Sequence, residues 1–356
     1  MKTFKLLFLI CAISSASATT LDQFSPRPVH GFPWSDAWYY YIHDPDVGYF
    51  KIVFLTFLNQ DTGADKQEAY LHVVFTPKTG QKREYDYYYK DVVAAPVNGD
   101  KPYSFKFEVP GAAKINESSI ELNLPDVSIS AQFKDEHIHY SNDENPGASP
   151  FGWVTSLPFV ENQWFVFSMA TETQYRFKDH WAQHSGHGLT YIDRGWNDGQ
   201  AAGMIYLMAV SEQVKLMFTG GIDGNLPIES WAGRLITPKH NLTFSPSIKG
   251  WDTTTKSDIC ASWMEVQMIE GDYRVKIVAE APLGSFYNHV TPSLTVFQSE
   301  NPVMKSMSAK TSVEVYKNDR LVETVSVDQS ILEYGGSHYC DKMHGKGQAA
   351  DLVKRP

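Results

Sequence analysis

Residues 188–197 hold the side chains of this sequence that are best suited to acid–base chemistry. If they form a strand, Tyr191 and Asp193 share one face, because side chains alternate along a strand. Arg194 and Trp196 then share the other face. An aspartate on the inner face of an aromatic-lined barrel has a raised pKa, because burial disfavours its charged form. Such an acid could protonate an alkene or a carbonyl, and aromatic faces could stabilise the resulting cation. The alternative is a structural ion pair between Asp193 and Arg194.

Three histidines, His180, His184 and His187, come just before this segment. Three imidazoles at such short spacing could in principle hold zinc. However, the surrounding residues predict a loop, and no cysteine or carboxylate completes an obvious ligand set. We therefore expect no metal site, and interpret these residues as exposed histidines or as one proton-transfer histidine.

The pattern Gly-x-x-x-x-Asp-Arg-x-Trp at residues 188–196 resembles a known signature. It is similar to the Gly-x-x-Trp-Met-Asp-Arg/His-x-Trp stretch of the carotenoid 1,2-hydratase and tocopherol cyclase-like superfamily. An aromatic run at residues 163–169 precedes it and another at residues 204–209 follows. Residues 36–40 resemble the opening strand of that family, and residues 313–336 resemble its last hairpin, which closes on Glu-Tyr-Gly-Gly. Tyr191 and Gly195 depart from the pattern, since bulkier residues are usual there.

The resemblance implies two lipocalin-like or sandwich-like β-domains with an apolar pocket at or near their interface. Relatives act without a redox cofactor on hydrophobic isoprenoids or polyketides. They hydrate a double bond, close a chromanol ring, or shape a substrate for cycloaddition, as the fungal decalin-forming Diels–Alderases do. The resemblance makes Asp193 the acid and Arg194 its orienting partner. The residues it implies as pocket walls are Tyr191, Trp196, Trp38, Trp164 and Tyr206.

Two other functions stay open at this point, because a fold does not fix a function. The cavity could bind a lipid or pigment without catalysis. Alternatively, a filled core would make the chain a structural or surface glycoprotein. A cyclase, hydratase or pericyclase of secondary metabolism is the favoured interpretation.

Alternation with a period of two dominates the rest of the chain and predicts an all-β fold. Residues 103–109, 120–124 and 275–277 each place apolar side chains on one face only. Asn318 and Asp319 separate two such runs, which predicts a β-hairpin. The polar, turn-rich stretch at 141–152 predicts a boundary between an N-terminal domain at 19–150 and a C-terminal barrel at 151–356.

Composition narrows the class of protein. The chain has 356 residues, 31 basic and 41 acidic side chains, a net charge of −10, and 13% aromatic residues. Clustered Lys and Arg, which phosphate contacts require, are missing, so a nucleic-acid partner is not expected. The low content of charged residues, 20%, argues against bulk disorder. The expected partner is a small hydrophobic ligand.

The first 18 residues predict a cleaved secretory leader. Two lysines precede an apolar run, and Ala16-Ser17-Ala18 supplies the small residues of a cleavage site. The run is too short to span a bilayer, and no later stretch is apolar enough for a transmembrane helix. Removal of the leader takes away Lys2 and Lys5, so the charge becomes 29 − 41 = −12.

Cleavage of the leader would also remove Cys11, and Cys260 and Cys340 would remain. A pair of cysteines in an oxidising compartment predicts one disulfide, and two free buried thiols are the alternative. Asn116 and Asn241 each begin an Asn-x-Ser/Thr sequon, so a eukaryotic host could glycosylate both.

Overall fold

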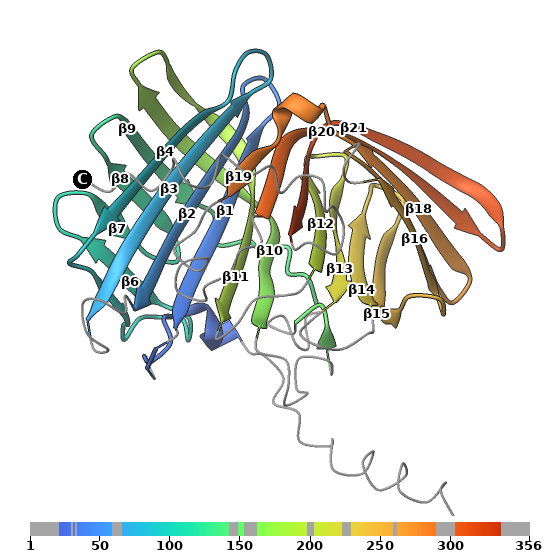
Figure 1. The fold of residues 1–356 in the computed structure, drawn as a ribbon, viewed down its shortest axis with the longest axis horizontal. Coiled ribbons are helices and arrows are strands. Elements are labelled where there is room, and N and C mark those ends of the chain that lie inside the picture. Colours follow the sequence, from blue (N-terminus) through green and yellow to red (C-terminus); the bar gives the residue numbers. More distant parts are fainter. Residues whose placement is uncertain are drawn as a thin grey trace, which may run out of the picture.

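Two curled antiparallel sheets lie side by side and make up the fold (Figure 1). The computed structural model describes residues 21–29, 31–32, 34–58, 66–141, 149–152, 162–197, 203–222, 229–258, 262–289 and 303–335. Helical structure in these ranges includes two short 3-10 turns, η1 (Leu21–Phe24) and η4 (Leu283–Ser285). The predicted all-β fold is confirmed. No helix in the described ranges has the length and hydropathy to span a membrane.

The first sheet is 11-stranded, with the order β4-β3-β2-β1-β11-β10-β9-β8-β7-β6-β5. It curls into a barrel, which we call the first barrel (Figure 1). Its strands are β1 (Ser35–Asp44), β2 (Gly48–Leu58), β3 (Gln67–Pro77), β4 (Arg83–Tyr89), β5 (Val93–Pro96), β6 (Phe105–Val109), β7 (Ala113–Ile115), β8 (Ser119–Asn123), β9 (Val127–Phe133), β10 (Asn162–Asp179) and β11 (Gln183–Asn197).

The second sheet is 10-stranded, with the order β15-β14-β13-β12-β21-β20-β18-β17-β16 and β19 paired to β20. It forms the second barrel. Its strands are β12 (Gly203–Val210), β13 (Lys215–Ile222), β14 (Glu229–Ile236), β15 (Asn241–Ile248), β16 (Thr253–Asp258), β17 (Trp263–Glu270), β18 (Tyr273–Glu280), β19 (Tyr287–His289), β20 (Val303–Lys317) and β21 (Arg320–Gly335).

The two barrels have different cores. Aromatic rings fill much of the first barrel: Phe24 of η1 stacks on Phe167 with centroids 4.0 Å apart, and Trp38 stacks on Phe54 at 5.2 Å. Aliphatic side chains and methionines dominate the second barrel. η1 therefore contributes a core residue to the first barrel, although it precedes the first strand.

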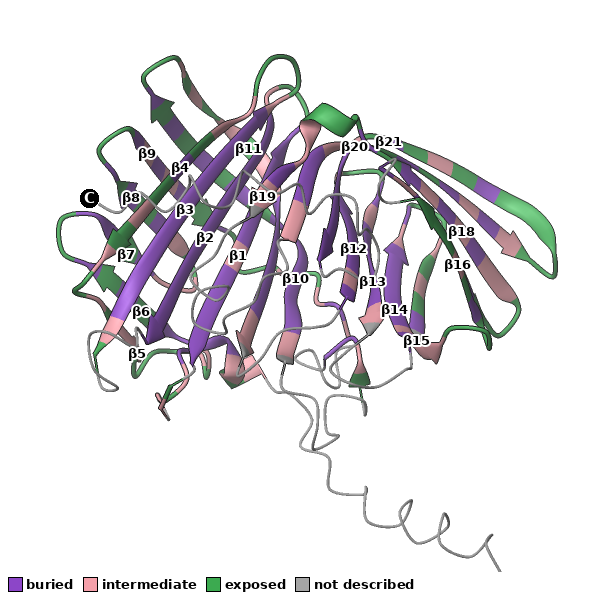
Figure 2. Ribbon diagram, in the orientation of Figure 1, coloured by how far each residue is buried: buried purple, intermediate pink, exposed green. Residues whose placement is uncertain are grey.

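A third apolar cluster lies between the two sheets and takes side chains from both. We call it the interface cluster. Because the first sheet packs on both of its faces in this region, every residue of β2 is buried (Figure 2). β6, far from the interface, instead alternates between buried and exposed residues. The interface cluster is therefore a second buried layer outside the first barrel.

The predicted alternation is confirmed where the strands have one solvent face. Phe105, Phe107 and Val109 point inward in β6, and Ile120 and Leu122 do so in β8. Val275 and Ile277 are buried in β18. Ser104, which the alternation places on the outer face, is buried instead. Asn318 and Asp319 connect β20 to β21 with φ of 48° and 60°. Two positive φ values in succession are typical of the tight turn expected at a two-residue hairpin.

The sheet boundary does not lie at 150/151. β10 and β11 form a hairpin that inserts between β1 and β9 of the first sheet. The change of sheet therefore falls between Asn197 and Gly203. The turn-rich stretch at 141–152, of which residues 142–148 lie outside the described part, connects two strands of one sheet. Turn composition marks the end of a strand, but it does not show which sheet the next strand joins.

Candidate active site between the two sheets

β11 lies between β1 and β10 and presents its side chains alternately to the two sides of the first sheet. Asp193 is paired in register with Tyr39 of β1, and Arg194 with Trp38. Asp193 faces the second sheet, whereas Arg194 faces the interior of the first barrel. The predicted division of faces is confirmed, but the face of Asp193 is the outer one, covered by the other barrel. Gly188 allows this close pairing, since a Cβ there would lie 2.6 Å from the carbonyl oxygen of His43.

Asp193 is 4% exposed and lies among hydrogen-bond donors. The hydroxyl of Tyr206, on β12, donates to its Oδ2 at 3.1 Å. Burial raises the pKa of Asp193 to about 7, against the opposing effects of the Lys305 ammonium and of hydrogen bonds from Tyr206 and Trp164. A carboxyl with this pKa can both hold and release a proton near neutral pH.

Arg194 does not contact Asp193. Its Nη2 lies 2.5 Å and 2.7 Å from the two carboxylate oxygens of Asp36, and both side chains are fully buried. Its guanidinium carbon lies 4.6 Å and 4.8 Å from the ring centroids of Trp38 and Trp196. The prediction that Arg194 orients Asp193 is therefore wrong. The alternative, a structural ion pair between Asp193 and Arg194, is wrong as well, because Arg194 pairs with Asp36.

Two of the expected pocket walls belong to the first barrel instead. Trp38 is fully buried there, and its indole N–H donates to the carbonyl oxygen of Phe24 at 2.8 Å. Trp196 packs against the same core. The other three, Tyr191, Trp164 and Tyr206, lie in the interface cluster with Asp193.

The second sheet contributes a charged row, of which the sequence predicted only Tyr206 as a site residue. Tyr206, Glu333, Lys305 and Tyr287 are successive cross-strand neighbours on β12, β21, β20 and β19. Lys305, 1% exposed, forms an ion pair with Glu333 and donates to the hydroxyl oxygen of Tyr41 at 2.6 Å. Glu333 lies in the Glu-Tyr-Gly-Gly motif, but no sequence signal placed Lys305 beside it.

A further buried amine, Lys51 of β2, lies at the same interface. Burial and the neighbouring Lys305 ammonium lower its pKa well below the usual range of a lysine. Its Nζ lies 5.7 Å from the ring centroid of Tyr287. Nearby, burial lowers the pKa of His72 to about 4, so this histidine is neutral while it hydrogen-bonds Glu84 at 2.9 Å.

The rim of the cluster nearest Asp193 is partly open to solvent, since Tyr39 and Trp164 are half-buried. Deeper in, four buried methionines line the cluster. Methionine adapts its shape more readily than branched side chains, so this lining can rearrange around a ligand. These four are Met169, Met208, Met217 and Met307.

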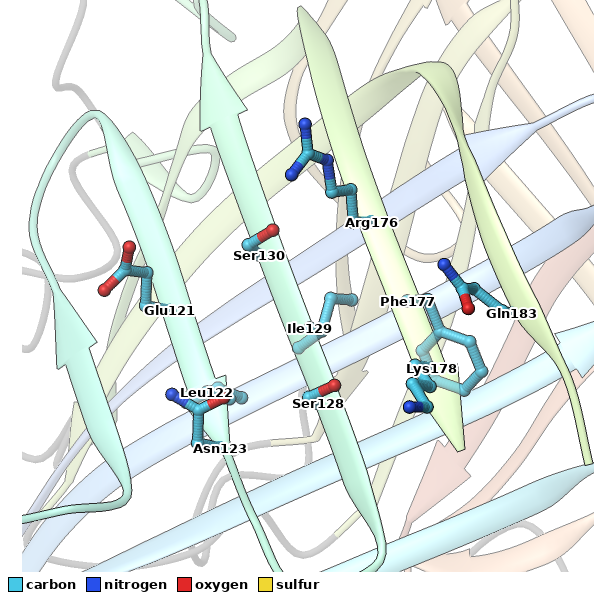
Figure 3. Close-up of a pocket in the computed structure, with 10 residues that line it drawn as sticks. All are labelled: Glu121, Leu122, Asn123, Ser128, Ile129, Ser130, Arg176, Phe177, Lys178 and Gln183. Atoms are coloured by element: carbon cyan, nitrogen blue, oxygen red, sulfur yellow. The ribbon is translucent and has the colours of Figure 1, made fainter. Parts of the chain in front are cut away.

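Two hollows formed by described residues at the protein surface lie elsewhere. One, of about 330 Å³, sits on β8, β9 and β10, where Ser128 and Ser130 lie between Glu121 on one side and Arg176 and Lys178 on the other (Figure 3). Another, of about 300 Å³, lies beside η1. Neither is lined by Asp193 or by the other expected site residues.

The histidine segment is not a loop throughout, because β11 begins at Gln183 and so contains His184 and His187. The Nε2 of His180 lies 2.9 Å from Asp126, and His184 packs against Phe75. In the described ranges no three His, Cys, Asp or Glu side chains are placed to hold a metal ion.

The remaining expectations concern secretion. Residues 1–18, Cys260 and Cys340 lie outside the described residues. Asn241 is exposed on β15, and its Oδ1 accepts hydrogen bonds from Arg234 at 3.0 and 3.2 Å. Asn116 is half-buried, and its Oδ1 accepts from Ser118 and Ser119.

No family model and no curated protein matches this chain by sequence. Solved structures do match: CghA with a TM-score of 0.55 and 9% identity, over 85% of this chain and 87% of that one. Kievitone hydratase from Nectria haematococca matches with a TM-score of 0.52 and 10% identity, over 92% of this chain and 95% of that one. An AttH-like protein of Nitrosomonas europaea matches with a TM-score of 0.50 and 11% identity, over 88% of this chain and 95% of that one. The chain shares their fold. At these identities the likeness concerns the fold alone, and it confirms the two-barrel architecture that the resemblance implied.

Proposed function

We propose that this protein is a cofactor-independent hydratase or cyclase that acts on a hydrophobic substrate between its two barrels. The observation that carries the proposal is the Asp193 carboxyl, buried among Tyr191, Tyr206 and Trp164 with a pKa raised to about 7. A protonated carboxylic acid against aromatic rings is suited to protonate an alkene. One protein with a similar fold, kievitone hydratase, is named for a hydration reaction, and this supports the proposal of a hydratase.

The proposed reaction begins when the Asp193 O–H gives its proton to one carbon of the double bond. The π electrons form the new C–H bond and leave a cation on the other carbon, which the faces of nearby aromatic rings stabilise. The oxygen of water then bonds to that carbon, and its surplus proton returns to the Asp193 carboxylate. In a cyclisation, a hydroxyl of the substrate takes the place of water. Either sequence regenerates the acid.

Replacement of Asp193 by Asn tests the proposal. The amide keeps the size of the side chain but has no acidic proton, so turnover should fall about 10²- to 10⁴-fold. Mass spectrometry would follow the gain of one water, or an isomer of equal mass, on polyenes and prenylated phenols. Asp86→Asn, on the exposed side of β4, is the matched control. Full turnover by folded Asp193→Asn protein would remove Asp193 from the role of acid, and binding without any product would favour a non-catalytic carrier.

The proposal includes a secreted or lumenal location, supported by the leader-like residues 1–18 and by the sequons at Asn116 and Asn241. A disulfide between Cys260 and Cys340 belongs to the same proposal. Mass spectrometry of the unreduced protein from its native host should show a chain that begins at Thr19 and has no alkylatable thiol.

A further inference from the structure

A polar trough runs along the outer face of the first barrel, on β8, β9 and β10 (Figure 3). Its floor is formed by Ser128 and Ser130 of β9, which are half-buried between longer side chains of the two neighbouring strands. The walls are polar residues that pair with these serines in register, namely Asn123 and Glu121 on β8, and Lys178 and Arg176 on β10. We call this hollow of about 330 Å³ the serine trough. Small residues between long ones leave room for a chain-like ligand.

The charged walls of the serine trough do not pair with each other. Neighbouring strands lie about 4.8 Å apart, so the backbones of Glu121 and Arg176, two strands apart, are separated by about 10 Å. Within the described ranges, the side chains of Glu121, Arg176 and Lys178 form no hydrogen bond or ion pair. By contrast, Glu172, farther along the exposed side of β10, pairs with Lys134 at 2.5 Å. One wall of the trough therefore presents two cations that no described residue neutralises by direct contact.

An exposed tryptophan lies at one end of the serine trough. Trp181 is 72% exposed, in the turn between β10 and β11. This turn is fixed, since the backbone N–H groups of Trp181 and Ala182 donate to Oδ1 of the buried Asp179 at 2.8 and 2.7 Å. The indole ring packs edge-to-face with the ring of His180 at 5.9 Å, and Nε2 of His180 lies 2.9 Å from Asp126. The ring is thus held in place while most of its surface is free to contact a ligand.

The tryptophan and the trough belong to one continuous surface. Side chains alternate along β10, so Arg176 and Lys178 share its outer face, and His180, directly after the strand, continues their row. In the same way, Asp126 precedes β9 and continues the row of the two serines. The contact between His180 and Asp126 therefore closes the trough at the end where Trp181 lies.

These groups together favour a sugar chain that carries carboxylates. The face of an indole ring is apolar and electron-rich, and so attracts the C–H groups of a pyranose. Hydroxyl and amide side chains exchange hydrogen bonds with sugar hydroxyls. Arg176 and Lys178 can each bind a carboxylate, whereas Glu121 repels one and accepts from hydroxyls instead. A lipid surface fits less well, because no described residue that lines the trough is an exposed apolar one.

We infer that the serine trough and Trp181 form a binding site for an acidic oligosaccharide, a chain of pyranose units that includes uronates. Trp181 stacks on one sugar unit, while Arg176 and Lys178 bind carboxylates of the units within the trough. The site is separate from the proposed acid. Gln183 of the trough begins β11 and Asp193 lies near the other end of that strand, about 30 Å away along an extended chain. The inference therefore does not depend on the proposed function.

Three hexasaccharides that contain uronates test the inference: oligogalacturonate, oligomannuronate and a hyaluronan fragment. Each is compared with its methyl ester, which has the same skeleton but no charge, and calorimetry measures binding to the full chain. At least one acid should bind, and about tenfold or more tightly than its ester, because the ester cannot form a charged pair with Arg176 or Lys178. Its affinity should fall as the salt concentration rises.

Exposed positions allow variants that leave the fold intact. Trp181→Ala and Arg176→Gln should each weaken binding of the acid about tenfold, and Ser130→Phe, which fills the floor, should abolish it. Trp251→Ala is the matched control for the ring, because Trp251 is 73% exposed on the second barrel. Lys106→Gln, on the exposed side of β6, is the control for loss of a charge. Both controls should bind as tightly as the unchanged chain.

The inference would be overturned if none of the three acids bound, or if acid and ester bound equally well. Binding that survives unchanged in Trp181→Ala, Arg176→Gln and Ser130→Phe would also overturn it. Hexaglutamate bound as tightly as the best sugar would show a site for acidic peptides instead. Binding to vesicles of anionic phospholipid, with no binding of sugars, would show a membrane-binding surface.

Discussion

Two buried carboxyls, Asp36 and Asp193, lie on opposite sides of the same sheet and have opposite partners. Asp36 touches the guanidinium of Arg194 and accepts the backbone N–H of Arg27 at 2.9 Å. Among the described residues, the hydrogen-bond donors in direct contact with Asp193 are neutral, and the Lys305 ammonium acts on it from farther away. Burial raises the pKa of both carboxyls, but within the described part of the chain only Asp36 has a directly bound cation to oppose that effect.

The different partners show how β11 can carry Arg194, which stabilises the core of the first barrel, beside Asp193, the candidate acid between the sheets. Arg194 and Asp193 are adjacent in sequence, so alternation along β11 sends one into each layer. The Asp36 carboxylate is held on both of its oxygens by one nitrogen of the Arg194 guanidinium, and both side chains are fully buried, so no room is left for a ligand. The Asp193 carboxyl, held by phenol and indole donors and with a pKa raised by burial to about 7, is still partly protonated at neutral pH. We expect three changes to separate these roles.

The largest effect should come from Arg194→Met, which leaves the Asp36 carboxylate buried without its cation. The free energy of unfolding should fall by about 3–5 kcal/mol, as for other broken buried ion pairs. Urea denaturation at neutral pH measures it. The double variant with Asp36→Asn should recover much of the loss, because Asn still accepts the Arg27 N–H. A loss below about 1 kcal/mol would mean that Asp36 is not held by this pair.

The next effect is the pH dependence of stability. Because the pKa of Asp193 is about 7 in the folded chain and 3.8 in the unfolded one, the folded chain binds the proton more tightly. This contribution to stability is complete below about pH 4 and is lost as the pH rises to about 7. The loss for this group should be on the order of 4 kcal/mol.

Asp193→Asn keeps the neutral form at all pH values and should not show that loss. Urea unfolding of both proteins at about pH 5 and about pH 8 measures the difference, which should grow with pH in favour of the variant. Curves that stay parallel would show that Asp193 is ionised in the folded protein, and the contrast with Asp36 would disappear.

The smallest effect should come from Trp196→Leu. The ring of Trp196 lies against the guanidinium groups of Arg27 and Arg194, at 4.7 and 4.8 Å from their carbons. Loss of these cation–π contacts should lower the free energy of unfolding by about 1 kcal/mol. Calorimetry can compare it with Arg194→Met. Equal losses would mean that the ring, not the carboxylate, stabilises Arg194.

The sequence predicts local features of this molecule well, because alternation is a property of neighbouring residues. It predicted the strands, the hairpin at Asn318 and Asp319, and the division of Asp193 from Arg194. It did not predict the partners of either residue. Asp36 is 158 residues from Arg194, and Lys305 is 264 from Tyr41. Such pairings depend on which strands become neighbours, and the alternation pattern carries no information about that.

The same gap explains the misplaced boundary and the misassigned pocket walls. The resemblance implies one pocket that holds Trp38 and Trp196 together with Asp193. In the structure, alternation places Trp38 next to Arg194 and so in the first barrel. The resemblance to known proteins singled out Asp193, but only the arrangement of the second sheet shows that Lys305 and Glu333 lie near it.

The insertion of the β10–β11 hairpin between β1 and β9 has a consequence for the order of folding. A growing chain that has reached residue 150 has made nine strands, but β1 and β9 each still offer an unpaired edge to other chains. These edges are covered only after residue 197 has been made. A fragment cut at the turn-rich stretch should therefore aggregate, whereas one that ends near Asn197 could close its own edges. The last two strands of the first sheet to be synthesised, β10 and β11, thus lie at its middle.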